Sequence, residues 1–266
     1  MNRIDQTFQT LKSQRRVGLI PFFTCGDPSL ESAVHIMHAL VASGADVIEL
    51  GVPFSDPQAD GPVIQRSSER ALQRKVGLRQ VLQVCTEFRV ENRNTPIVLM
   101  GYLNPIEIFG ADRFAAAAAE AGVDGVLLVD CPPEEAQPIR EAFSQHGLHL
   151  VLLASPTTDA ARVKLIVDQA QGYLYYVSFA GVTGAAGLAP AEVSARVAGL
   201  KAQCSVPVAV GFGVRDAESA KALAAESDGV VIGSALVERL AKGESKEQAA
   251  AIAAEFLGPI RRALDH

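Results

Sequence analysis

The stretch ASGADVIEL, residues 42–50, contains the pattern that decides the fold. A glycine ends a helical segment, an aspartate follows within two residues, and a nearly continuous apolar run comes next. EAGVDGVLL at 120–128 and AESDGVVIG at 225–233 repeat this pattern, the latter with Ser in place of Gly. Gly suits the end of a helix, and an apolar run without alternation is typical of a parallel strand covered on both faces. The repeated unit is therefore a helix followed by a buried parallel strand.

Eight such apolar runs begin at residues 18, 46, 96, 124, 148, 173, 206 and 229: GLIPFFT, DVIELGV, PIVLMGY, DGVLLVD, LHLVLLA, YLYYVSF, VPVAVGF and GVVIGSA. Segments with helical periodicity lie between them, and Asp27 with Pro28 is expected to begin the first as N-cap and first helical residue. The pattern predicts a single-domain (β/α)8 TIM barrel over residues 1–266. An extra N-terminal helix is expected near 2–13 and an additional C-terminal helix near 245–264.

Composition argues against several classes of protein. The chain is 48% hydrophobic and 20% charged, and no apolar run approaches the roughly 18 residues of a membrane span. The N-terminus has no apolar signal segment, so a cytoplasmic protein is expected. The net charge is −6 and the basic residues are scattered, which argues against nucleic acid or a membrane surface as partner. Neither the cysteines nor His35 and His38 complete a metal-ligand pattern, so no metal is expected.

The spacing between apolar runs is widest after the second and the sixth, and the loops that follow barrel strands form the active face. The second strand and its loop read IELGVPFSDPQADGP, residues 48–62, with three acids and no Lys or Arg. Glu49 lies inside the strand, where burial without a cation would raise its pKa and make it a proton donor at neutral pH. The alternative is a strand-end glutamate that reaches solvent or a backbone donor.

Asp60 lies on the same loop, which three prolines restrict, and is expected to bring a second carboxylate to the pocket as an acceptor for a ligand N–H or O–H. Its alternatives are an Asx-turn or a cap of the helix that begins near Pro62. Asp56 is interpreted as a turn former. Glycine-bearing turns follow the last three strands, in SFAGVTGAAGLAP at 178–190, GFG at 211–213 and GSA at 233–235. They predict a phosphate site built from backbone N–H groups, with ordinary turn chemistry as the alternative.

The motifs IELGVPFSDPQADGPVIQ, FFTCGDP, GVTG, VGFGV and IGSA, in this order along the whole chain, resemble those of the tryptophan synthase alpha subunit family. The resemblance implies retro-aldol cleavage of indole-3-glycerol phosphate to indole and glyceraldehyde 3-phosphate in tryptophan biosynthesis. It implies no cofactor in this chain, and an α2β2 heterotetramer with a β subunit that carries pyridoxal phosphate. Glu49 would then be the general acid/base, and Asp60 would accept a hydrogen bond from the indole N–H.

The resemblance and the positions of the strand ends together suggest three further sets of residues. The pocket for the substrate is expected to be lined by Phe22, Met100, Tyr102, Leu127, Tyr175, Thr183 and Phe212, although core packing would explain these side chains equally well. The phosphate is expected at Gly184, Gly213, Gly233 and Ser234. Contact with the partner subunit is expected at Pro53, Asp56, Gln58, Asn104, Ile106 and Phe109. In YLNPIEIFG, residues 102–110, the apolar groups are expected to be exposed in a loop, or else to pack against neighbouring helices.

Three other functions are compatible with a phosphate-binding barrel. An isomerase, or the synthase that makes the indole ring, would need a Lys or a Cys/Asp pair at strand ends, whereas Glu49 is the ionisable acid that the first three strands offer there. A catalytically silent barrel that regulates a partner has no need for both Glu49 and Asp60. A stand-alone lyase that releases free indole would keep the same chemistry without the partner subunit.

Overall fold

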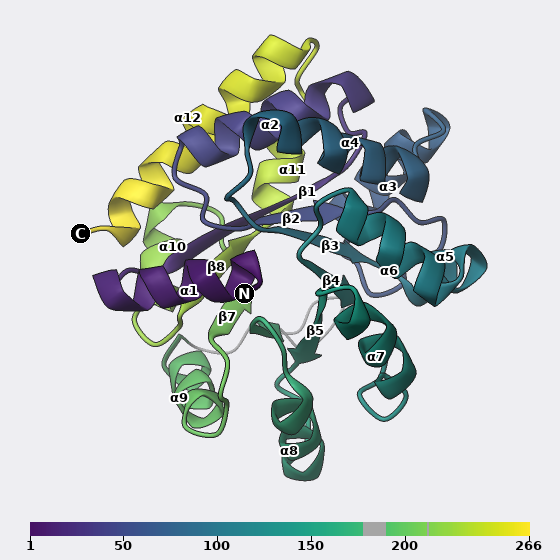
Figure 1. The fold of residues 1–266 in the computed structure, drawn as a ribbon. Helices are drawn as coiled ribbons and strands as arrows, with labels where there is room; N and C mark the ends of the chain where they lie inside the picture. Colours follow the sequence, from purple (N-terminus) through teal and green to yellow (C-terminus); the bar gives the residue numbers. More distant parts are fainter. Residues whose placement is uncertain (178–189, 212) are drawn as a thin grey trace.

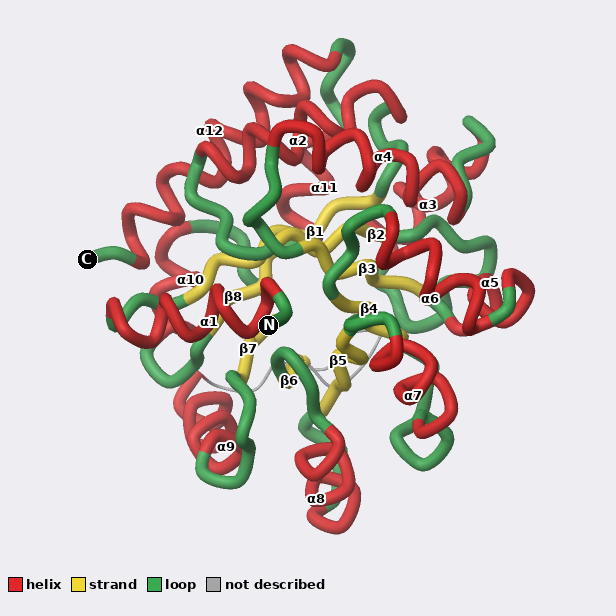
Figure 2. Tube along the Cα trace, viewed as in Figure 1, coloured by secondary structure: helices red, strands yellow, loops and turns green. Residues whose placement is uncertain are grey.

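The computed structural model describes residues 1–177, 190–211 and 213–266. Within these ranges eight parallel strands, each paired with its neighbour in sequence and the last with the first, form a closed barrel surrounded by helices (Figure 2). The predicted (β/α)8 barrel is thus confirmed. The strands are β1 Gly18–Thr24, β2 Ile48–Gly51, β3 Ile97–Gly101, β4 Gly125–Leu128, β5 His149–Ala154, β6 Leu174–Val177, β7 Val208–Gly211 and β8 Gly229–Ile232.

The helices cover the outside of the barrel, and the wide gap after β2 holds two of them. Among the described residues they are α1 Arg3–Gln14, α2 Leu30–Ala42, α3 Pro62–Gln73, α4 Leu78–Glu91, α5 Leu103–Phe109, α6 Ala111–Glu120, α7 Gln137–Gln145, α8 Ala160–Gln169, α9 Pro190–Lys201, α10 Ala217–Ala224, α11 Ser234–Leu240 and α12 Lys246–Leu264. None of them combines the length and apolar character that a membrane crossing needs.

Each aspartate of the repeated pattern exchanges hydrogen bonds with the beginning of the preceding strand. Its backbone N–H donates to the carbonyl of one residue there, and its carboxylate accepts from the N–H of that same residue. The pairs are Asp46 with Leu19, Asp124 with Ile97, and Asp228 with Val208. Gly44 and Gly122, which precede two of these aspartates, have φ angles of 98° and 82°. The pattern therefore encodes both the end of a helix and the start of strand pairing.

Helix α1 lies across the end of the barrel where the strands begin, which we call the base (Figure 1). Asn2 caps the helix and also donates to the carbonyls of Asp124 and Gly147. Ile4 and Phe8 are buried against the barrel interior. Helix α12 packs along α2 on the outside. Both terminal helices were predicted. The observed ends lie within one residue of the predicted ones.

The prediction that Asp27 and Pro28 begin helix α2 is wrong. Ser29 is the N-cap, its side chain accepts from the N–H of Ser32, and the helix begins at Leu30. Asp27 is instead 2% exposed and accepts two hydrogen bonds from the guanidinium of Arg70 on α3. The carboxylate of Asp27 is thus directed toward α3, and Ser29 caps α2 in its place.

Candidate active site

Glu49 points into the barrel near the end where the strands finish, which we call the mouth. Its neighbours Ile48 and Leu50 belong to the core between strands and helices, whereas Glu49 pairs in register with Phe22 of β1 and Val98 of β3. Side chains alternate along a strand, so Glu49 must face inward. The residue is fully buried, which excludes the alternative of a strand-end glutamate that reaches solvent.

Among the described residues, the carboxyl of Glu49 has one hydrogen-bond partner. The hydroxyl of Tyr173, itself fully buried, donates to Oε1 at 2.6 Å, and Oε2 has no partner among the described residues. Burial raises the pKa of Glu49 to about 8, although the hydrogen bond from Tyr173 acts in the opposite direction. Glu49 is therefore mainly protonated at neutral pH, and its free oxygen can donate that proton to a group bound in the mouth.

Asp60 lies on the loop between β2 and α3. Gly61 is the N-cap of α3 and Pro62 its first residue, so the carboxylate of Asp60 does not cap this helix. Its Oδ2 accepts a hydrogen bond of 3.0 Å from the hydroxyl of Tyr102. Burial raises the pKa of Asp60 to about 6, and the hydrogen bond from Tyr102 limits that rise. At neutral pH Asp60 is mainly ionised, so Glu49 is the neutral acid and Asp60 the charged acid of this pair.

A small cavity between β1, β3 and α3 brings several predicted residues together. Phe22, Met100 and Tyr102 line it with Asp60, and Thr24 and Ser68 add hydroxyl groups. The ring of Tyr102 stacks on Phe54, with centroids 4.9 Å apart. This arrangement combines apolar walls with one carboxylate, the combination of groups that is typical of small-molecule sites.

The other predicted pocket residues lie deeper in the barrel or outside the described ranges. Leu127 and Tyr175 belong to the interior cluster that contains Tyr173. A Cβ at Gly211 would lie 2.0 Å from the hydroxyl oxygen of Tyr175, so glycine is required there for the tyrosine to fit. Thr183, Gly184 and Phe212 lie outside the described residues.

The described phosphate candidates lie at the mouth after β7 and β8. Gly213 has a φ of 83°, with open space where a Cβ would be. Gly233 is the N-cap of α11, and Ser234, its first residue, is exposed. Backbone N–H groups at these turns can approach an anion without interference from a side chain. Their role in holding phosphate stays a prediction.

The partner candidates differ in exposure. Asp56, Gln58 and Asn104 are exposed. Asp56 accepts a hydrogen bond from the hydroxyl of Ser55, in keeping with a turn former. The expectation of an exposed apolar loop is wrong for Ile106, since residues 103–109 form helix α5 and Ile106 is 4% exposed.

The helical spacing of residues 103–109 places the apolar side chains on different faces. Phe109 is half-buried, with its ring edge-on to Phe114, while Ile108 is 76% exposed. Pro53 is also buried. A partner subunit could therefore meet Ile108 and the polar candidates directly, but would reach Pro53 and Ile106 only through their neighbours.

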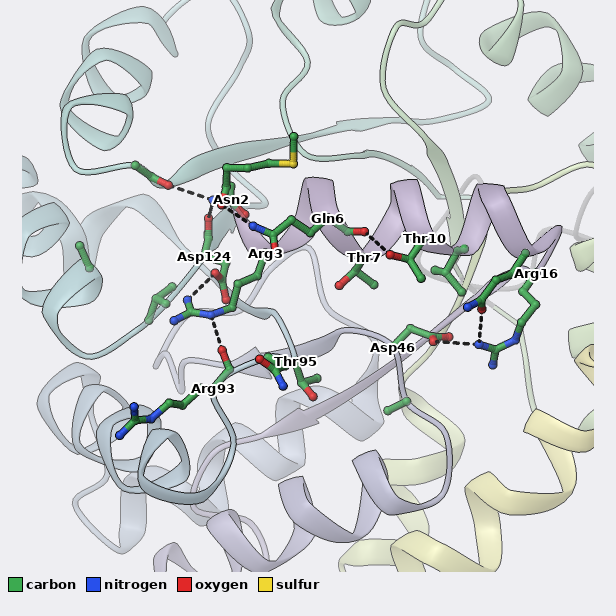
Figure 3. A pocket seen from close by; sticks show the side chains of 18 of the residues that line it. Asn2, Arg3, Gln6, Thr7, Thr10, Arg16, Asp46, Arg93, Thr95 and Asp124 are labelled. Atoms are coloured by element: carbon green, nitrogen blue, oxygen red, sulfur yellow. Dashed lines mark hydrogen bonds and ion pairs between the residues drawn. The ribbon is translucent and has the colours of Figure 1, made fainter.

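A separate polar groove lies at the base of the barrel, beneath α1 (Figure 3). Two of its arginines are paired with aspartates: Arg3 binds Asp124, and Arg16 lies 4.0 Å from Asp46. The carboxyl ends of barrel strands carry chemistry, whereas the opposite end contributes stability. The base groove is therefore not the candidate active site.

Tyr173 was missed as a site residue by sequence reasoning. The run YLYYVSF was recognised as a strand, and Tyr173 and Tyr175 are two residues apart, so they share the inward face. That spacing was the available signal. It could not indicate that one hydroxyl meets Glu49, because the contact depends on how far β6 is shifted relative to β2.

Comparison with known proteins shows the family of the chain. The family model of the tryptophan synthase alpha chain matches residues 8–264. Tryptophan synthase alpha chains of Xylella fastidiosa (strain M12) and Xanthomonas axonopodis pv. citri (strain 306) are 62% and 59% identical, with 100% of this chain and 99% of each relative covered. Tryptophan synthase subunit alpha from Legionella pneumophila strain Paris has a TM-score of 0.93 at 45% identity, covering 100% of this chain and 99% of that one.

A chain of the tryptophan synthase α2β2 complex from Pyrococcus furiosus has a TM-score of 0.81 at 38% identity, covering 92% of this chain and 97% of that one. Both the family model and the relatives extend over nearly the full length of the sequence. The present chain therefore belongs to the tryptophan synthase alpha chain family.

Proposed function

We propose that Glu49 and Asp60 carry out the cleavage of indole-3-glycerol phosphate in this chain. As a tryptophan synthase alpha chain, the protein is an indole-3-glycerol phosphate lyase of tryptophan biosynthesis. The observation that carries the residue assignment is the burial of Glu49: a tyrosine hydroxyl donates to one carboxyl oxygen, and the other oxygen has no partner within the described ranges. The reaction would take place in the cytoplasm.

The two acids suit the two charge changes of the reaction. Neutral Glu49 donates its proton to the indole carbon that bears the glycerol chain, and the ring nitrogen becomes positively charged. The bond between ring and chain then breaks, its electron pair returns to the ring, and the hydroxyl on the departing carbon becomes an aldehyde. The hydroxyl proton passes to the Glu49 carboxylate, which restores the neutral acid. No net proton is consumed.

Ionised Asp60 would stabilise the positive ring through its N–H. A charge-assisted hydrogen bond in a site shielded from water is stronger in the transition state than in the bound substrate, so it lowers the barrier. Tyr102 fixes the orientation of that carboxylate. The turns at Gly213, Gly233 and Ser234 would hold the phosphate from the opposite side of the mouth with backbone N–H groups.

The chain would work within an α2β2 complex, as in the relative from Pyrococcus furiosus. The β subunit of tryptophan synthase holds the pyridoxal phosphate, so this chain needs no cofactor of its own. The exposed residues Asp56, Gln58 and Asn104 are the candidates for contact with that subunit. Because the loop of Asp56 and Gln58 leads to Asp60, the partner could influence the site through it.

Release of indole from indole-3-glycerol phosphate tests this function. The purified chain is given the substrate alone and with a tryptophan synthase β subunit, and indole is quantified. We expect slow release alone and a large increase with the partner. Equal rates in both cases would favour a stand-alone lyase, and no release in either would leave a phosphate-binding barrel without this activity.

A further inference from the structure

Near the mouth lies an ion pair that the proposed reaction does not use, formed by a buried carboxylate and a partly exposed guanidinium. Asp27 follows β1 and is 2% exposed. Nε of Arg70 donates to its Oδ1 at 2.8 Å and Nη2 donates to its Oδ2 at 2.6 Å. One guanidinium thus binds both carboxylate oxygens. This geometry fixes both the distance and the relative orientation of the Arg70 and Asp27 side chains.

A second contact joins the same two elements one turn earlier in α3. The hydroxyls of Thr24, at the end of β1, and Ser67 lie 2.5 Å apart in a buried hydrogen bond. Ser67 also donates to the carbonyl of Ile64 in its own helix. We call the pairs Thr24–Ser67 and Asp27–Arg70 the α3 anchor. They attach one helix to β1, the strand that pairs directly with Glu49 through Phe22.

The anchored helix leads directly to Asp60. Gly61 and Pro62 begin α3, and the side chain of Gln65 donates to the backbone carbonyl of Asp60 at 2.9 Å. On the other side, Tyr102 holds the carboxylate. The backbone of Asp60 is therefore held by α3. The anchor holds α3 against β1, together with the apolar packing of Ile64 and Ala71.

We propose that Arg70 is a positioning residue, which acts through α3 to hold Asp60 at a fixed distance from Glu49. This inference rests on the proposed function. A displacement of about 1 Å at a reacting geometry can lower a rate by roughly 10²-fold, so a small relaxation of α3 is enough to matter. Lys keeps the positive charge of Arg70 but lacks the planar pair of donors, so it cannot hold both oxygens of Asp27.

The test compares Arg70→Lys and Asp27→Asn with Arg66→Met. Arg66 lies one turn before Arg70 on α3 and is exposed, and no hydrogen bond or ion pair of its side chain occurs among the described residues. Steady-state kinetics of indole release are measured from pH 5 to 9 with the β subunit present, and the folded fraction is checked by circular dichroism.

The anchor variants are expected to lower kcat about tenfold with little change in KM, because Asp60 acts mainly in the transition state. Loosening of α3 would also admit water to Asp60, so its pKa would fall and the acid limb of kcat/KM would move to lower pH. Tyr102 and Tyr175 are the titratable groups that interact with Asp60. Arg66→Met should have the same kcat and the same acid limb of kcat/KM as the unmodified chain.

Folded anchor variants with normal kcat, or with lowered kcat and an unmoved acid limb, would overturn the proposal and leave a purely structural ion pair. Asp60→Asn separates this failure from failure of the proposed function. If Asp60→Asn is inactive while Arg70→Lys is normal, the positioning role alone is wrong. If Asp60→Asn is fully active, the assignment of Asp60 is wrong. Should Arg70→Lys not fold, Asp27→Asn, which removes charge but little volume, provides the same readout.

Discussion

A buried carboxylate at the base of this barrel and another at its mouth lie in opposite environments. At the base, Asp124 is 3% exposed and binds the guanidinium groups of Arg3 and Arg89 at 2.8 and 2.9 Å. At the mouth, Glu49 is fully buried, and a tyrosine hydroxyl is its hydrogen-bond partner within the described residues. Asp124 directly precedes β4, Glu49 is the second residue of β2, and both strands are short and parallel, so the fold alone does not explain the different environments.

Guanidinium groups thus neutralise a buried acid at the base, where stability is the requirement. Gly122, with its positive φ, lets Arg89 approach closely enough to reach Asp124. Even Asp27, near the mouth, is paired with Arg70. An unpaired buried carboxyl costs free energy, because it must stay neutral or lose hydration. Its presence at Glu49 is therefore best explained by chemistry.

The largest effect is expected from Glu49→Gln, which removes the proton and leaves the shape of the side chain. Indole release should fall at least about 10³-fold, within the range found when a general acid is removed, while substrate binding persists. The measurement is kcat and KM for indole-3-glycerol phosphate with the β subunit present. Asp124→Asn, the matched change at the base, is the control. Comparable losses of kcat in the two variants would contradict the assignment of catalysis to Glu49 and of stability to Asp124.

Asp124→Asn should instead destabilise the protein. It leaves Arg89, whose side chain is 10% exposed, without its counter-charge, so the free energy of unfolding should fall by about 3 kcal/mol. Urea unfolding measures this, and the folded fraction should keep a nearly normal kcat. If Asp124→Asn is fully stable but inactive, Asp124 acts in catalysis, and its assignment to stability is wrong.

Much of this architecture could be predicted because it depends on local patterns. The apolar runs, the glycine or serine before aspartate and the turn glycines gave the eightfold barrel and both terminal helices. Where prediction failed, a distant partner decided the outcome. Asp27 was expected to cap a helix but pairs with Arg70, and Ile106 was expected in an exposed loop but faces inward from a short helix.

The candidate site was predictable in part for the same reason. Glu49 could be placed inside the barrel from strand alternation, and its lack of a cation was visible in the loop sequence. The contacts Tyr173 to Glu49 and Tyr102 to Asp60 span 124 and 42 residues, and strand register and loop path bring them together. Neither is encoded in any local pattern.

A smaller effect is expected in the pH dependence of stability. Burial raises the pKa of Glu49 to about 8, so the folded chain binds a proton between about pH 5 and 8 that the unfolded chain has released. Stability therefore decreases as pH rises through this window, by up to about 1.4 kcal/mol per pH unit from this group, and the decrease ends above the folded pKa. The difference in unfolding free energy between the unmodified chain and Glu49→Gln should show this slope. A difference that is flat from pH 5 to 8 would mean that Glu49 is not proton-bound in the folded state.

The most direct test is titration of the Glu49 carboxyl itself. Carbon-13 NMR of the chain labelled at glutamate side-chain carboxyls, with Glu49→Gln to identify the resonance, follows its protonation from pH 4 to 10. We expect a midpoint of about 8, well above the ordinary range of glutamate. A midpoint near that ordinary range would show that Glu49 is ionised at neutral pH and could not act as the proton donor.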